Sequence, residues 1–307
     1  MSVRIFSEQS AAERSLFVDR YLQFLHERDG VLDRQQGRLS RREQRLAELA
    51  ADPIQRSGAA VVDQRTYEEN AVERDVAEQG LDRWTLWAIC VSKCSRMEEY
   101  AVRYLQESGR SRAGADDDPY TFIDLEERYH GRMLESVHQV IGITPRWRKP
   151  PLLSRLGLLA ILAVPRAIAN ITILCGEIIG VATFLLLLQS ARALCADQPL
   201  ARERIEAILR EILTDEVGHV LFLRSQLGPV RLAIARLLLP IIARSLISGY
   251  PEMRWLYGSK QLLDAILDPD LFDRVLTEVG GLPLITQAVS AKAELIAAGL
   301  PQSGSGS

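Results

Sequence analysis

The sequence predicts an all-α protein, and two observations support this fold class. The chain reads as helical nearly throughout, and no stretch shows the sustained period-two alternation of a half-buried strand. Glycine and proline are concentrated in a few breaks, among them Pro119, Pro145, Pro150-Pro151 and Gly228-Pro229. Long helices joined by short connections are therefore expected.

Composition excludes several classes of protein. The chain has 307 residues, enough for one large domain or two modest ones, and its 47% hydrophobic and 25% charged residues exclude an intrinsically disordered chain. A formal net charge of -3 gives no electrostatic case for a nucleic-acid partner. The first residues lack the apolar core of a signal peptide, and the four cysteines form no C-x-x-C pair. A cytoplasmic protein with reduced, buried thiols is expected.

The N-terminal part, residues 1–79, is expected to be a helical extension. It contains two polar helices within 11–49, of which the second is highly charged and expected at the surface, and a Ser/Gly/Pro-rich patch at 52–59.

The central part, residues 80–226, is expected to hold four long helices. Asp118 is a typical N-cap for the second of them, and Pro119 suits its first helical position. The four helices are predicted at 79–107, 119–142, 166–195 and 200–226.

The C-terminal part, residues 227–302, is expected to form apolar helices that pack on the central ones. The final SGSGS, residues 303–307, is typical of a flexible tail or linker.

Residues 167–191 are long enough and apolar enough to span a membrane. However, Glu177 lies near the centre of this run, where a charge in a bilayer costs on the order of 3 kcal/mol or more, and the flanks lack aromatic belts. A fully buried central helix is the preferred interpretation. The apolar, Arg-containing segments 152–165 and 231–249 could lie at a membrane interface, but capping of the helical core is preferred for them too.

The histidines carry the strongest functional signal. Of four, three follow a glutamate by three residues, which places both side chains on one helix face: Glu127/His130, Glu135/His138 and Glu216/His219. The first and third pairs lie in the middle of apolar stripes, where Glu and His are costly unless they are paired or metal-bound. Glu135 and His138 lie off the stripe and are expected on a partly exposed face, and His26 is expected to be incidental.

The other two central helices each offer a carboxylate in an apolar stripe. Glu98 is favoured on the first helix, with Glu99 as the second choice, and Glu177 is the candidate on the third. At about 1.5 Å per residue, Glu98 and Glu127 both lie about 12–14 Å from the turn that joins their helices. Glu177 and Glu216 both lie about 24–27 Å from the next turn. Two antiparallel hairpins therefore each bring a lone Glu level with a Glu-x-x-His.

This set of residues resembles the ligand set of the ferritin-like di-iron carboxylate proteins, whose four-helix bundle supplies two lone Glu and two Glu-x-x-His motifs. The strings EERYHG and DEVGH are similar to motifs of the soluble acyl-carrier-protein desaturases and, more distantly, of the arylamine N-oxygenases and demethoxyubiquinone hydroxylases. The resemblance covers roughly 80–226. Arylamine N-oxygenases carry an additional histidine where this chain has Ile212, which argues against that group.

The resemblance implies a ferritin-like bundle that binds two Fe ions, or one Mn and one Fe, with O2 as co-substrate. Glu127 and Glu216 would bridge the metals, Glu98 and Glu177 would be terminal ligands, and His130 and His219 would complete the set. Asp215 and Glu126 would orient the histidines. No catalytic residue beyond the metal ligands is implied.

Small residues near these ligands leave two interpretations open. Gly176 and Gly180 flank Glu177, and Gly218 lies inside the second Glu-x-x-His, so they either make room for a substrate or allow close helix packing. Tyr129 points away from His130 and is expected to pack or to form a hydrogen bond between helices.

The function expected from the resemblance is an O2-dependent di-iron oxygenase, hydroxylase or desaturase acting on an apolar or carrier-bound organic substrate. An external electron donor or reductase is expected, because no flavin, NAD or iron–sulfur motif is present. The alternatives are a membrane-surface quinone or lipid hydroxylase of the same fold, a ferritin-type iron oxidation or storage protein, and a metal-free relic. A homodimer and a peripheral membrane contact are left open.

Overall fold

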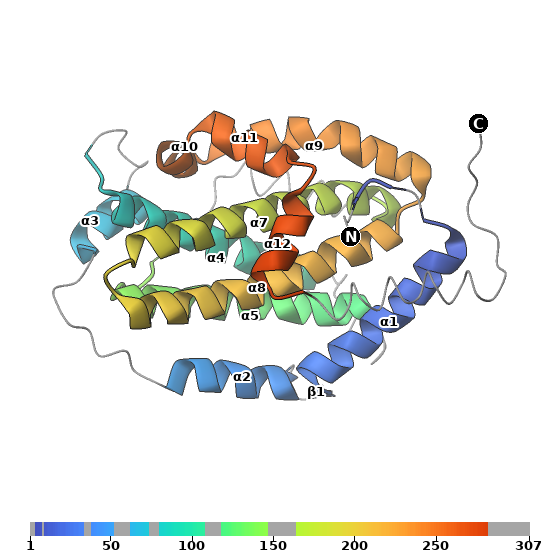
Figure 1. Ribbon diagram of the computed structural model, residues 1–307, viewed down its shortest axis with the longest axis horizontal. Coiled ribbons are helices and arrows are strands. Elements are labelled where there is room, and N and C mark those ends of the chain that lie inside the picture. The colour runs from blue at the N-terminus through green and yellow to red at the C-terminus, as the bar shows by residue number, and fades with distance from the viewer. Residues whose placement is uncertain are drawn as a thin grey trace.

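The computed structural model describes residues 4–7, 9–33, 38–51, 62–73, 80–107, 118–146 and 164–281, and these are predominantly helical (Figure 1). The all-α prediction is confirmed. Within the described ranges the strands are limited to β1, Leu32–Asp33, and β2, Arg38–Leu39, which pair antiparallel and connect two helices.

Four long helices lie side by side in the centre of the molecule (Figure 1). They are α4 (Arg83–Glu107), α5 (Pro119–Ile141), α7 (Arg166–Leu194) and α8 (Pro199–Ser225). α4 packs on α5, α7 packs on α8, and the two pairs meet through α5–α8 and α4–α7 contacts. Apart from the start of α4, the bounds of these helices agree with the sequence prediction to within one residue.

The start and end of α5 show why these predictions succeed. Asp118 caps the helix by accepting a hydrogen bond from the backbone N–H of Tyr120, and Pro119 occupies the first turn, where no N–H is needed. The helix ends at Gly142, whose φ of 81° is left-handed and therefore suits glycine.

The N-terminal helices are α1 (Ala11–Asp29) and α2 (Ser40–Ala51), and α1 packs against both α5 and α8. A short helix, α3 (Gln64–Glu68), runs into a π-helical turn, Glu69–Glu73, beside α4. The expected surface location of α2 is wrong for one of its faces, because the side chain of Arg42 is fully buried among carboxylates.

The C-terminal helices cover the central ones. They are α9 (Pro229–Gly249), α10 (Pro251–Tyr257), α11 (Ser259–Leu267) and α12 (Leu271–Glu278). α9 packs along α7, α10 on α4, α11 on α9 and α7, and α12 on α7 and α8. Segment 152–163, the expected C-terminal helices beyond 281 and the expected tail at 303–307 lie outside the described residues.

Among the described helices, α7 alone is long and apolar enough to cross a membrane, and 67% of its most apolar window is buried inside the protein. Its second half is well enclosed: the indole N–H of Trp87 donates to the backbone oxygen of Leu187 at 3.0 Å. The expectation of complete burial is wrong for the first half, where Ile168 is 52% exposed and Gly176 is exposed.

Candidate metal centre

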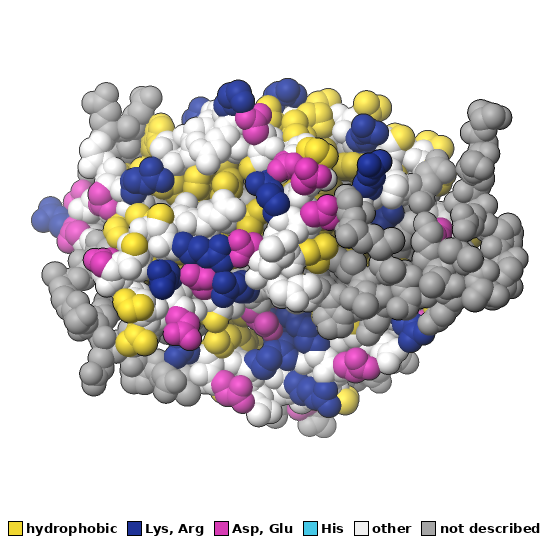
Figure 2. All heavy atoms as spheres, in the orientation of Figure 1, with side chains coloured by type: hydrophobic (Ala, Val, Ile, Leu, Met, Phe, Trp, Pro, Cys, Tyr) yellow, Lys and Arg dark blue, Asp and Glu magenta, His cyan; other side chains and the backbone are white. Residues whose placement is uncertain are grey.

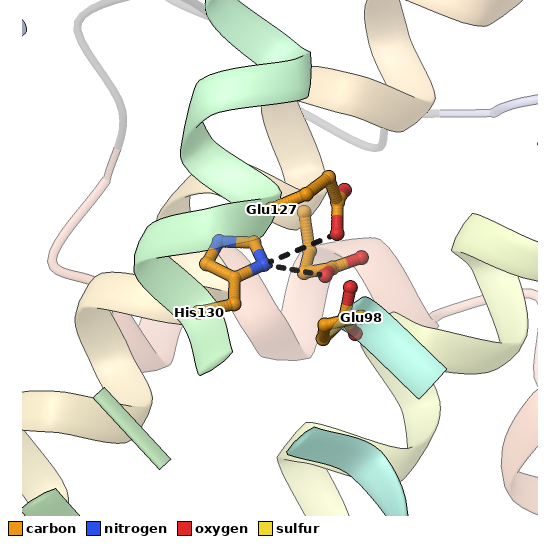
Figure 3. A group of neighbouring side chains, drawn as sticks. Glu98, Glu127 and His130 are labelled. Atoms are coloured by element: carbon orange, nitrogen blue, oxygen red, sulfur yellow. Dashed lines mark ion pairs between the residues drawn. The ribbon is translucent and has the colours of Figure 1, made fainter. Parts of the chain in front are cut away.

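Six predicted side chains converge between the four central helices. Two overlapping groups can each hold a metal ion, because one ligand atom from every member lies within 4.8 Å of the others. The first group is Glu98, Glu127, His130 and Glu216, and the second is Glu127, Glu177, Glu216 and His219. Figure 3 shows Glu98 of α4 facing Glu127 and His130 of α5. Glu127 and Glu216 belong to both groups, so each can reach two ions.

The two histidines are oriented by hydrogen bonds on the side away from these glutamates. His130 Nε2 lies 2.9 Å from Asp215 Oδ2, and His219 Nε2 lies 2.9 Å from Glu126 Oε2. A carboxylate accepts, so each Nε2 carries the proton and donates. The partners cross between helices, since Asp215 of α8 holds the histidine of α5 and Glu126 of α5 holds that of α8.

The other ring nitrogens of the same histidines are buried and have no hydrogen-bond partner within the described structure. His130 Nδ1 lies 3.4 Å from Glu216 Oε1, and His219 Nδ1 lies 3.0 Å from Glu127 Oε1. Buried polar nitrogens are rarely left unsatisfied. A cation between each Nδ1 and the neighbouring carboxylates would satisfy both sides, so the donor set fits a metal.

The charges of the cluster support this fit. Burial and the neighbouring Glu127 raise the pKa of Glu98 well above its ordinary value, and burial and Glu177 do the same for Glu216. Burial by itself would lower the pKa of His219, but its hydrogen bond to Glu126 raises that pKa well above the usual value. Protonated histidines lower the pKa of Glu127 in the absence of a metal, and a divalent cation would supply the positive charge that lets the other carboxylates ionise as well.

Three arginines and three carboxylates form a set of ion pairs behind His130, and Glu126 Oε1 lies 3.8 Å from Arg28 of this set. Its members are Arg28, Arg42, Arg45, Asp29, Glu211 and Asp215. Arg28 and Arg42 both pair with Asp215, and each also lies 3.0 Å from Glu211 Oε1. The arginines thus fix the carboxylate that orients His130.

Sequence reasoning missed this arginine set because its cations come from the N-terminal helices. A usable signal was present in α1, where Phe17, Tyr21 and Leu25 form a buried stripe that continues to Arg28. A charged residue at the end of a buried stripe points to a buried partner.

A cavity of about 770 Å³ opens beside the glutamates of the cluster. Glu98, Glu127, Glu177 and Glu216 all contribute to its wall, and most of the remaining lining is apolar. The cavity extends along α7 to side chains of α9, α10 and α11. Its volume lies within the range of small-molecule sites.

The structure separates the roles of the three glycines. Gly176 and Gly180 line the cavity, which is what we expect if these glycines make room for a substrate. A Cβ at Gly176 would meet nothing within 4 Å, whereas one at Gly180 would lie 3.0 Å from Glu216 Oε2. Close packing therefore also applies to Gly180, and it applies to Gly218, where a Cβ would lie 3.1 Å from the buried ring of Tyr21.

The expectation of a partly exposed face is correct for Glu135 but wrong for His138, which is fully buried. His138 Nδ1 donates to the backbone oxygen of Leu134 at 2.8 Å, and its Nε2 lies 2.6 Å from Ser92 Oγ of α4. Those partners allow burial without a metal, and His138 belongs to neither ligand group.

Three other sequence predictions have different outcomes. Tyr129 forms a hydrogen bond, but to strand β2 and not to another helix, since its hydroxyl accepts from the backbone N–H of Leu39 at 3.0 Å. The side chain of Glu99, the second choice on α4, lies outside the part of the chain that the structure describes. All four cysteines are buried and free, as expected.

No family model, no curated protein and no solved structure matches this chain. The geometry of the site is therefore the basis on which a function can be inferred.

Proposed function

We propose that the chain is a ferritin-like dimetal carboxylate protein that uses O2 to oxidise an organic substrate. The observation that carries the proposal is the pair of overlapping ligand groups, which share Glu127 and Glu216 and leave one buried nitrogen of each histidine facing the glutamates. This pattern is the one expected of two adjacent metal ions with two bridging carboxylates.

Each ion has a distinct set of side chains in this proposal. Glu98 and His130 would hold one ion, Glu177 and His219 the other, and Glu127 and Glu216 would bridge them. Carboxylate oxygens and imidazole nitrogens suit iron or manganese, and a pair of such ions would supply electrons and open positions for O2. Asp215 and Glu126 accept hydrogen bonds from Nε2 of the histidines, so Nδ1 would be the nitrogen that holds a metal.

The cavity favours an organic substrate over iron storage. Its largely apolar wall reaches the four glutamates, so an apolar molecule could lie against the metals. Because the sequence holds no motif for an organic redox cofactor, a separate reductase would supply electrons for repeated turnover. A cytoplasmic location remains part of the proposal.

The test is metal analysis of the purified protein, followed by an optical spectrum of the iron-loaded protein after exposure to O2. We expect two iron or manganese ions per chain and an absorption change on oxidation. The α5 helix offers a matched pair of buried histidines: His130→Gln should lose metal, whereas His138→Gln should keep it.

Three results would contradict the proposal. The first is a wild-type protein that binds neither iron nor manganese, and the second is equal metal content in the two histidine variants. The third is uptake of iron far beyond two ions per chain, which would identify iron storage instead.

A further inference from the structure

The outward face of α9 carries an apolar stripe. Four of its aliphatic side chains are exposed by 72%, 40%, 72% and 61%, namely Val230, Ile234, Leu237 and Ile241. Their spacing of four, three and four residues places them on one face of the helix, over roughly 16 Å of its length. In Figure 2, hydrophobic atoms are exposed along the upper edge of the molecule, where α9 runs.

The stripe is not a by-product of packing, because α9 uses a different face to join the protein. Leu232, Ala235, Leu239 and Ala243 are buried on the opposite side. Cys175 of α7 donates a hydrogen bond to the backbone oxygen of Ala235 at 3.4 Å, which fixes that side against α7. The inner face of α9 therefore holds the helix against the protein without any contribution from the outer stripe. The exposed aliphatic side chains of the stripe need a separate explanation.

The charges of α9 indicate what covers the stripe. Arg231, Arg236 and Arg244 are exposed, and the 21 residues of the helix include no acidic side chain. At 3.6 residues per turn, Arg231 and Arg236 fall on opposite sides of the stripe. Aliphatic groups bordered by arginines match a bilayer surface, where the apolar groups enter the acyl region and guanidinium groups meet anionic headgroups.

A second copy of the chain fits this face less well. Two copies related by a two-fold axis would bring six of these arginines together with no acidic partner on the helix. Four aliphatic side chains also fall well short of the roughly 800 Å² per partner that a stable interface buries.

We propose that α9 binds the surface of an anionic lipid bilayer through this stripe and its arginines. Leu246 and Ile247, in the last turns of the same helix, line the cavity beside the glutamates. The membrane-facing helix thus also forms part of the cavity wall. Membrane binding itself does not depend on the metals.

The test is flotation of the full-length protein with vesicles of phosphatidylcholine alone or of phosphatidylcholine with phosphatidylglycerol. Wild type should float with the anionic vesicles and less at high salt, because salt screens the arginines. Leu237→Ser/Ile241→Ser should weaken binding at least about tenfold, and Arg231→Gln/Arg236→Gln/Arg244→Gln by roughly a hundredfold. Circular dichroism of each variant verifies folding.

Leu200→Ser is the matched control, because Leu200 is 63% exposed in the first turn of α8 and does not belong to the stripe. It should bind as wild type does. The proposal is overturned if wild type stays unbound, or if the α9 variants bind as strongly as the control, which would assign binding to another segment. It is also overturned if wild type forms dimers without lipid that the Leu237→Ser/Ile241→Ser variant abolishes.

Discussion

Replacement of Asp215 by asparagine is the sharpest test of how the N-terminal helices support the candidate metal centre. The Asp215 side chain is fully buried, pairs with Arg28 and Arg42, and accepts a hydrogen bond from His130. Asp215→Asn keeps the size of the side chain and removes its charge. Arg28 and Arg42 then lose the fully buried carboxylate that pairs with both of them.

The size of the effect follows from these contacts. Loss of one partner from a buried ion pair destabilises a protein by about 3–5 kcal/mol, because a buried charge is left uncompensated. Glu211 remains 3.0 Å from both arginines, so the lower end of that range is expected. Metal affinity should also fall by roughly 10–100-fold, since an asparagine oxygen orients His130 less strongly than a carboxylate.

The free energy of unfolding should be measured by denaturant titration of the metal-free protein, and metal affinity by competition with a chelator. Glu203→Gln is the matched control, because it removes an exposed carboxylate from the same helix and should change stability by less than about 0.5 kcal/mol. In the double variant Arg42→Met/Asp215→Asn, the loss should be smaller than the sum of the single losses by about 0.5–3 kcal/mol. The reasoning fails if Asp215→Asn matches the control in both measurements.

Three further perturbations test separate parts of the structure. Gly218→Ala should be less stable to unfolding than Gly176→Ala by about 1–3 kcal/mol, because both variants gain the helix propensity of alanine but only the methyl group at 218 would lie 3.1 Å from the buried ring of Tyr21. Equal thermal stability of the two variants would refute this. Burial lowers the pKa of His138, so the unfolded chain binds the extra proton first, and the contribution of this residue to stability should fall as pH drops through about 6.5. In denaturant titrations, the free energy of unfolding should therefore decrease less between neutral and mildly acidic pH for His138→Gln than for wild type. Equal decreases in the two proteins would contradict this prediction. Glu127→Ala should abolish binding of both metals, because its carboxylate belongs to both ligand groups, and two bound ions in that variant would exclude it as a bridge.

The helix bounds, and the position of each candidate ligand along its helix, could be predicted from features that act within a few residues. The cap at Asp118, the proline at position 119 and the apolar stripes act within a few residues, so a single sequence carries them. A constant rise per residue then put Glu98 level with Glu127, and Glu177 level with Glu216, in agreement with the two ligand groups.

The partners of buried polar groups could not be found in this way. His138 lies off the apolar stripe of its own helix, yet it is buried because Ser92 of α4 provides a hydrogen bond. Likewise, the charge pattern of α2 indicates a surface helix, and only the carboxylates packed beneath it explain a buried Arg42.

The sequence by itself determined the helices, the faces they bury and the six residues that can meet between them, because periodicity and helical rise are properties of short segments. Only the tertiary structure decided which groups hold the histidines, which arginines neutralise Asp215, and that α9 is apolar on its outer face as well as its inner one. Arg42 and Asp215 are 173 residues apart in the chain. Such contacts depend on how whole helices pack, and no local pattern specifies that packing.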